Sequence, residues 1–213
     1  LIGYGLTETN AGGTNAGGQF LLNKPSTAGF PMPLITKIRI VDEENNVLNA
    51  QKEGEIEIKT ASNFTCYWKN QEATDEALNQ EGWFKSGDIG YLDDEGFLFI
   101  KDRKKDIVIR GGENIACLEV EAVIHENTYI KEASVFGVPD DRLGEKLVAR
   151  VSVEDLSKVN ELDLQIFLQG KIASFKIPEI IWLQKEPLPK IATGKTAKKE
   201  MREEAIVALG LVK

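Results

Sequence analysis

The sequence predicts an α+β protein in which a small, β-rich, barrel-like segment precedes a compact mixed α/β domain. Alternating apolar and polar residues at 35–41 and 54–59 have the period of two that is typical of half-buried strands. Beyond residue 106, helix and strand patterns follow one another instead. A charged segment, residues 101–106, separates the two patterns. We therefore expect two domains, at residues 1–102 and 103–213.

The N-terminal part contains short strands and glycine-rich turns. A tandem repeat of Thr-Asn-Ala-Gly-Gly, residues 9–13 and 14–18, has a composition that suits a mobile loop. The strands at 35–41 and 54–59 predict a hairpin that turns near 44–46. The other predicted elements are a helical turn at 75–79 and short strands, broken by glycine turns, at 83–84, 87–91 and 96–100.

The C-terminal part contains longer apolar periods and predicts a mixed domain. Its order is a strand at 107–110, a glycine turn, a second strand, a helix at 118–125, strands at 133–138 and 147–153, a helix at 162–172, a strand at 180–183 and a charged helix at 197–209.

Composition excludes several classes of protein. With 213 residues, 42% of them hydrophobic, the chain can bury a core. Its formal net charge of -8 opposes the phosphate backbone, so nucleic acid is not an expected partner. Apolar runs such as residues 180–183 are too short to predict a transmembrane segment. The 2 cysteines cannot form a disulfide framework, which favours a cytoplasmic location.

The first residue is a leucine that opens an apolar segment without the pattern of a secretory signal. We expect the chain to start within a longer polypeptide. Any active site would then be incomplete in residues 1–213.

Five short segments carry the information about function. They are Tyr-Gly-Leu-Thr-Glu at 4–8, Ser-Gly-Asp at 86–88, Arg-Lys-Lys-Asp at 103–106, Arg-Gly-Gly-Glu-Asn-Ile at 110–115 and Pro-Lys-Ile-Ala-Thr-Gly-Lys at 189–195. Together and in this order they resemble the motifs of the adenylate-forming enzymes, which include acyl- and aryl-CoA synthetases, peptide-synthetase adenylation domains and firefly luciferase. The residues at 113–115 are most similar to those of acyl-CoA synthetases, and the resemblance covers the C-terminal portion of such an enzyme.

The resemblance implies a two-step ligase reaction. A carboxylic acid, expected to be a fatty acid, reacts with ATP to give acyl-AMP and pyrophosphate, and the thiol of coenzyme A then displaces AMP. ATP, Mg²⁺ and coenzyme A are the implied cofactors. Aryl-CoA ligase, amino-acid adenylation and a non-catalytic accessory binding module remain as alternatives.

The resemblance also assigns roles in the N-terminal part. Tyr4 would stack on adenine, in a nucleotide-binding segment that includes Gly5. Thr7 would contact the phosphate or the acyl carbonyl, and Glu8 would help to hold Mg²⁺, which prefers oxygen ligands. Asp88 would accept hydrogen bonds from the ribose hydroxyls. Without the resemblance, an ordinary solvated carboxylate is the favoured interpretation of Glu8. The alternative for Asp88 is a turn residue after Gly87.

Further roles follow for the charged segment and the first glycine pair. Arg103 would reach the ribose or a phosphate. Lys105 matches the hinge on which the C-terminal domain swivels between the two half-reactions, where many relatives carry aspartate. Gly111 and Gly112 would let the pantetheine arm of coenzyme A pass close to the backbone, although a hairpin turn explains the pair equally well.

Lys195 is the candidate catalytic cation. Adenylation brings two anions together, and their repulsion is about 4 kcal/mol at roughly 4 Å and an effective dielectric constant near 20. A lysine can reach both anions, whereas the alternative is a surface lysine in a basic tail. Gly-Lys-Thr at 194–196 is not a P-loop, because Pro189 stands where the first glycine is required. The relatives' phosphate loop is absent from this sequence, so we expect residues 1–213 alone not to catalyse adenylation.

Overall fold

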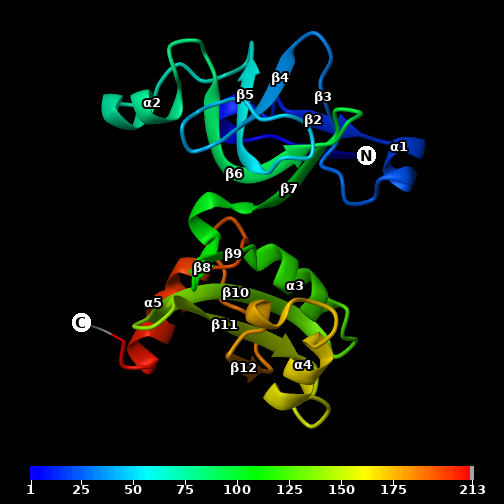
Figure 1. The fold of residues 1–213 in the computed structure, drawn as a ribbon, viewed down its shortest axis with the longest axis vertical. Helices are drawn as coiled ribbons and strands as arrows, with labels where there is room; N and C mark the ends of the chain where they lie inside the picture. The colour runs from blue at the N-terminus through cyan, green and yellow to red at the C-terminus, as the bar shows by residue number, and fades with distance from the viewer. Residues whose placement is uncertain (212–213) are drawn as a thin grey trace. The chain divides into compact units, whose positions relative to one another are not determined.

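The computed structural model describes residues 1–211 and divides into two compact units, the first ending at Lys105 and the second beginning at Asp106 (Figure 1). Both units combine sheets and helices, so the predicted mixed class of fold is confirmed. The division lies three residues beyond the boundary that we drew from the sequence. That the C-terminal domain is a mobile lid, which swivels at Lys105 between the two half-reactions, stays a prediction.

The first unit contains two antiparallel sheets. The smaller has the order β1 (Ile2–Tyr4), β2 (Thr14–Ala16) and β3 (Phe30–Pro31). The larger has the order β4 (Thr36–Val41), β5 (Gly54–Thr60), β6 (Phe84–Leu92) and β7 (Leu98–Arg103), and it confirms the hairpin of β4 with β5. Short helices η1 (Thr7–Thr9), α1 (Gln19–Asn23) and α2 (Gln71–Ala77) connect the strands.

The larger sheet is open, with β4 and β7 at its edges. A single bridge between Gly29 and Leu98 links β7 to the segment that precedes β3. The apolar residues that alternate in the sequence, Ile40, Ile56 and Ile58, are buried together with Leu98. Within residues 1–211 the strands form no closed barrel, so the barrel-like shape that we expected is not confirmed.

The tandem repeat is not simply a loop, because its second copy contains β2, which pairs with β1. The glycines of its first copy, Gly12 and Gly13, are needed for close packing rather than for mobility. A Cβ on Gly13 would overlap the carbonyl oxygen of Tyr4, and one on Gly12 would lie 2.5 Å from the hydroxyl of Ser62. Composition alone cannot separate these two uses of glycine.

The strands expected at 83–84 and 87–91 form one strand, β6, and Gly87 does not end it. Between the pairs Glu55–Ile89 and Glu57–Lys85, β6 has two residues more than β5. The strand therefore bulges at Ser86–Asp88, and Gly87 adopts a φ of 71° there. The helical turn expected at 75–79 is α2, which starts earlier, where Asn70 caps it.

The second unit follows the predicted order closely. Its elements are β8 (Val108–Arg110), β9 (Glu113–Ile115), α3 (Cys117–His125), β10 (Ile130–Asp140), β11 (Gly144–Val153), α4 (Glu161–Leu168), η3 (Ser174–Lys176), β12 (Ile180–Gln184) and α5 (Lys198–Ala208), after the short turn η2 (Lys104–Asp106). The sheet has the order β10-β11-β8-β9, and β12 lies parallel to β11.

Helices cover both faces of this sheet (Figure 1). Val135 of β10 packs in one cluster with residues of α3 and α4. The next residue, Phe136, packs on the opposite face with Met201 and Ala205 of α5. Neighbouring side chains of β10 are thus buried on opposite faces of the sheet, which explains why this strand is a continuous apolar run in the sequence.

Over residues 1–211, no helix is both long and apolar enough to cross a membrane. Cys117 is buried and Cys66 is exposed, and neither forms a disulfide.

We predict that Gly13→Ala destabilises the first unit by about 1–3 kcal/mol, because the new methyl group would overlap the backbone of β1. Urea unfolding measures the loss. Gly17→Ala is the matched control, since its methyl group would meet only the exposed Leu1, at 3.3 Å. Equal stability of the two variants would contradict this account of the repeat.

Candidate functional site

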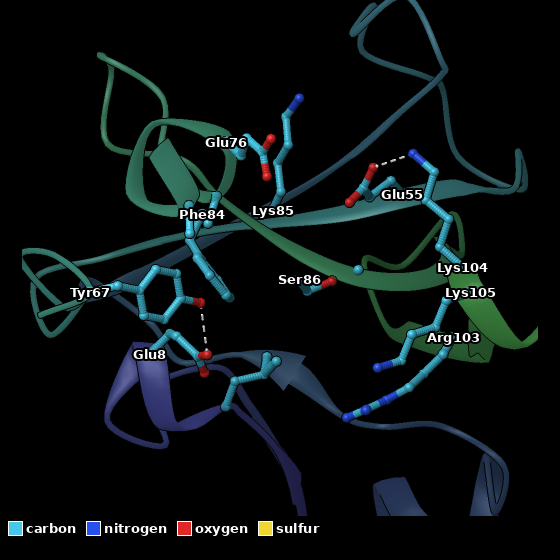
Figure 2. A pocket seen from close by; sticks show the side chains of 14 residues that line it. Glu8, Glu55, Tyr67, Glu76, Phe84, Lys85, Ser86, Arg103, Lys104 and Lys105 are labelled. Atoms are coloured by element: carbon cyan, nitrogen blue, oxygen red, sulfur yellow. Dashed lines mark hydrogen bonds and ion pairs between the residues drawn. The ribbon is translucent and has the colours of Figure 1, made fainter. Parts of the chain in front are cut away.

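A cavity of about 820 Å³ opens in the first unit between η1, β6 and the end of β7 (Figure 2). Its charged lining residues are Glu8, Glu55, Glu76, Lys85, Arg103, Lys104 and Lys105. Three of these residues were predicted from the sequence, namely Glu8, Arg103 and Lys105. The cavity thus brings a carboxylate from residues 4–8 together with the basic segment that ends the unit.

Glu8 lies on η1, and the hydroxyl of Tyr67 donates a hydrogen bond of 2.9 Å to its Oε1 (Figure 2). The backbone of the same residue accepts a 2.6 Å hydrogen bond from the N–H of Phe64. Partial burial, followed by the bond to Glu8, raises the pKa of the Tyr67 phenol. The segment at 64–67 therefore fixes both the backbone and the carboxylate of Glu8.

Aromatic packing holds this segment in place. The ring of Phe64 lies 4.7 Å from that of Tyr67 and 5.7 Å from that of Phe84 on β6, centroid to centroid. The N–H of Tyr67 donates to the hydroxyl of Thr74 on α2. Tyr67 is thus attached to α2 directly and to β6 through Phe64.

Asp88 is the best-connected of the predicted residues. Only 6% of it is exposed. The hydroxyl of Tyr4 donates to its Oδ2 at 2.6 Å, and Nε of Arg103 lies 3.5 Å from its Oδ1. Burial, followed by the hydrogen bond to Asp88, raises the pKa of the Tyr4 phenol well above its usual range. Three residues from three of the predicted segments therefore form one cluster.

The bulge in β6 explains how Asp88 reaches this cluster. The hydroxyl of Ser86 accepts the N–H of Asp88 at 3.0 Å and donates to the carbonyl of Ile56 at 2.7 Å. This side chain replaces a strand-to-strand bond that the bulge removes. The motif Ser-Gly-Asp therefore has a structural reason: the serine stabilises the bulge, the glycine permits its backbone and the aspartate is turned toward Tyr4.

The basic segment sends its side chains in two directions (Figure 2). Those of Arg103 and Lys105 extend into the cavity, whereas that of Lys104 turns to Glu55 and forms an ion pair of 2.9 Å. Lys104 is held by the first unit, and Lys105 is the last residue of that unit. The position predicted as a hinge is thus the position at which the contacts divide.

Gly5 and Thr7 lie in the same segment as Tyr4 and Glu8. A Cβ on Gly5 would approach the backbone of Ala11 to 2.7 Å, so only glycine fits. Thr7 begins η1 and is exposed. Its hydroxyl is therefore accessible to a ligand.

The predicted residues of the second unit lie in two turns. Gly111 and Gly112 connect β8 to β9 with φ values of 60° and 89°, which other residues adopt rarely. Lys195 lies in a tight turn and is exposed. Within residues 1–211 its ammonium group forms no ion pair.

The residues around Glu8 fit a Mg²⁺ ion that is bound mainly by the phosphates of a nucleotide. Over the described chain, no three His, Cys, Asp or Glu residues group as a metal site. Glu8 offers a carboxylate oxygen at the cavity beside its bond to Tyr67. One protein carboxylate combined with phosphate oxygens is a common environment for Mg²⁺, whereas a structural metal would need more ligands.

We did not predict Tyr67 and Glu55, which hold Glu8 and Lys104. Tyr67 lies 59 residues from Glu8 and Glu55 lies 49 residues from Lys104. The aromatic run at 64–68 was the available signal, but no pattern within the chain indicates which carboxylate the tyrosine meets.

Two family models match the chain. The model described as AMP-binding enzyme matches residues 1–68, and the model described as AMP-binding enzyme C-terminal domain matches residues 119–195. Together they cover more than half of the chain.

Curated relatives agree with the family models. The chain is 40% identical over 203 residues to a long-chain-fatty-acid–CoA ligase of Bacillus subtilis, covering 95% of this chain and 36% of that protein. It is also 40% identical over 203 residues to a 2-succinylbenzoate–CoA ligase of Listeria monocytogenes, covering 94% and 40%. The chain therefore spans well under half the length of these relatives.

Solved structures are similar as well. The O-succinylbenzoate coenzyme A synthetase of Bacillus subtilis, in complex with ATP and magnesium ion, superposes with a TM-score of 0.85 at 32% identity. The match covers 93% of this chain and 40% of the synthetase. The mixed α/β architecture is thus the one found in that enzyme.

We predict that Tyr4→Phe lowers the free energy of unfolding by about 1–3 kcal/mol at neutral pH, because buried Asp88 loses a hydrogen bond. The difference from the unchanged protein should shrink above about pH 10. Above this pH Tyr4 ionises in the unfolded chain, whereas in the folded chain its raised pKa keeps the proton on the phenol. The free energy of unfolding of the unchanged protein therefore falls, while that of the variant, which has no phenol, does not fall for this reason. Urea unfolding at several pH values checks this, and a gap that stays constant up to pH 11 would contradict it.

Proposed function

We propose, on the premise that this chain belongs to the AMP-binding enzyme family, that the protein containing it is a CoA ligase that activates a carboxylic acid as its adenylate. One observation of the site carries the proposal. A hydrogen bond from Tyr4 and an ion pair with Arg103 join these two residues to Asp88 in one cluster, next to a cavity that Arg103 and Glu8 line. Tyr4 and Asp88 suit the adenosine of a nucleotide. Arg103 and Glu8 suit its phosphates.

Asp88 would bind the ribose. Each of its oxygens already has one protein partner, and a carboxylate oxygen has two lone pairs. Both oxygens can therefore accept a ribose hydroxyl while Tyr4 and Arg103 keep the carboxylate in one orientation. Tyr4 would at the same time present its ring to the adenine.

Glu8 would hold Mg²⁺, which would neutralise charge on the phosphates of ATP. Tyr67 orients the carboxylate for this task. Arg103 and Lys105, whose side chains extend into the cavity, would add positive charge near the α-phosphate. The exposed hydroxyl of Thr7 would contact the phosphate or the acyl carbonyl.

Lys195 would supply the cation that lets the carboxylate approach the α-phosphate. Its ammonium group is exposed and forms no ion pair among residues 1–211, so its charge is available to a ligand. For the second half-reaction the lysine would withdraw by rotation at Lys105, and Gly111 and Gly112 would then line the path of the pantetheine arm.

The experiment is pyrophosphate release by the complete protein with ATP, Mg²⁺ and a panel of fatty and aromatic acids, followed by detection of the acyl-CoA. Residues 1–213 alone serve as a negative control, because they lack the relatives' phosphate loop. The absence of acid-dependent pyrophosphate release by the complete protein would refute the proposal.

A fatty acid is the substrate that we expect, and an aromatic acid is the second candidate. The second candidate has a specific basis, since the similarity to a 2-succinylbenzoate–CoA ligase is as high as that to a fatty-acid ligase. The panel separates the two by relative kcat/KM.

We predict that Lys195→Ala in the complete protein slows adenylation by at least about a hundredfold, because the two anions then meet without a cation. Thioester formation from supplied acyl-AMP should be nearly unchanged. Single-turnover assays of each half-reaction measure both effects. Lys199→Ala is the control, as this side chain is 91% exposed on α5, and an equal loss in both half-reactions of Lys195→Ala would reject the assigned role.

We predict that Tyr67→Phe raises the Mg²⁺ concentration for half-maximal adenylation about tenfold, since Glu8 loses the group that orients it. A titration of the initial rate with Mg²⁺ at saturating ATP is the measurement. Tyr129→Phe, in the second unit, is the control. An unchanged Mg²⁺ requirement in Tyr67→Phe would show that the hydrogen bond has no role at the site.

A further inference from the structure

Lys195 lies near the tip of a small hairpin in the second unit. Its carbonyl accepts the N–H of Ile191 at 2.9 Å, and the N–H of Gly194 donates to Ile191 at 2.8 Å. A bridge between Lys190 and Thr196 closes the hairpin. Residues 191–196 are all exposed, so the tip has no packing of its own, and the direction of Lys195 depends on what holds the base.

A carboxylate of β10 holds the N-terminal end of this hairpin. Oε2 of Glu132 accepts the N–H of Leu188 at 2.7 Å, and Oε1 pairs with the ammonium of Lys190 at 2.5 Å. The ion pair with Lys190 and the bond from Leu188 lower the pKa of Glu132. Because the side chain of Leu188 is buried against Phe136, this end of the hairpin is fixed to the sheet.

A carboxylate of α3 holds the C-terminal end of the hairpin. Oε1 of Glu121 accepts the N–H of Val135 at 2.7 Å and pairs with the ammonium of Lys198 at 2.9 Å. Val135 belongs to β10, an edge strand of the sheet, so this bond also satisfies a backbone N–H of that edge. Lys198 is the first residue of α5, directly after the hairpin.

We propose that Glu132 and Glu121 are positioning residues that clamp the two ends of segment 188–198 and thereby aim Lys195. Both carboxylates lie outside the cavity of the first unit, and neither pairs with Lys195 itself. They engage the lysines on either side of it, Lys190 and Lys198, so the backbone is fixed while the charge of Lys195 stays uncompensated.

The clamp has a functional consequence, which rests on the proposed function. A lysine side chain has four rotatable carbon–carbon bonds, and if its backbone also moved, its ammonium would rarely meet two anions at once. Displacement of a reacting group by about 1 Å can slow a reaction roughly a hundredfold. The clamp therefore affects adenylation, which needs Lys195, and not thioester formation.

The test compares Glu132→Ala and Glu121→Ala with Glu119→Ala in the complete protein. Glu119 is a matched control, since it lies on α3 and pairs with Lys176, away from the hairpin. We expect adenylation kcat to fall about tenfold to a hundredfold in the first two variants, with the KM for ATP and thioester formation from supplied acyl-AMP unchanged. Glu132→Gln should recover part of the rate, because its amide oxygen can still accept the N–H of Leu188.

Amide hydrogen exchange gives a readout that does not depend on catalysis. The N–H groups of Ile191, Gly194 and Ala197 should exchange faster in the two clamp variants than in Glu119→Ala, while those of β11 should not change. Lys190→Met breaks the ion pair without removing the backbone bond, so it tests the clamp if Glu132→Ala fails to fold.

The outcomes separate the two proposals. Unchanged exchange in the hairpin, or an equal fall in both half-reactions, would overturn the clamp. If the unchanged protein makes no acyl-adenylate, the proposed function fails, and the hairpin amides alone then decide whether Glu132 and Glu121 hold the segment.

Discussion

A carboxyl group that is buried as deeply as that of Asp88 needs hydrogen-bond partners, and the first unit is organised around providing them. The partners of the carboxyl group come from far apart in the sequence: Tyr4, in the first strand, donates a hydrogen bond to it, and Arg103, at the end of β7, forms an ion pair with it. Ser86, in the bulge, accepts the backbone N–H of Asp88. Each contact constrains a different segment. The three segments therefore form one site, and the aspartate is oriented before any ligand arrives.

Charge is distributed unevenly over this acidic chain. With a net charge of -8, the chain repels anions on average, so any site for phosphates and carboxylates must concentrate cations locally. The first unit does so with Arg103 and Lys105 at the cavity. In the second unit, Glu132 and Glu121 pair with neighbouring lysines and leave Lys195 exposed. Acidic residues thus support the cationic groups without neutralising the one that would react.

Much of the fold was predictable because burial on one face leaves a periodic pattern. Ile56 and Ile58 alternate with charged residues, and their strand was found within one residue of its observed end. The helices α3 and α5 were predicted for the same reason. Gly87 was misread as a break, because a glycine in a bulge and a glycine in a turn look alike until the partner strand is known.

The candidate site was predictable only where short motifs carry it. Asp88 and Glu8 lie in such motifs, and the structure brings their segments to one cavity or next to it. Tyr67 and Glu132 lie in none. Their partners are more than fifty residues away. The pairing depends on how strands and helices pack, and no periodic pattern in the sequence indicates that packing.

We propose that the cluster of Tyr4, Asp88 and Arg103 binds the nucleotide. A crystal structure of the complete protein with a non-hydrolysable acyl-adenylate analogue is the decisive measurement. We expect the ribose hydroxyls within hydrogen-bond distance of both oxygens of Asp88, with the adenine against the ring of Tyr4. A well-ordered analogue bound elsewhere, with no contact to Asp88, would contradict it.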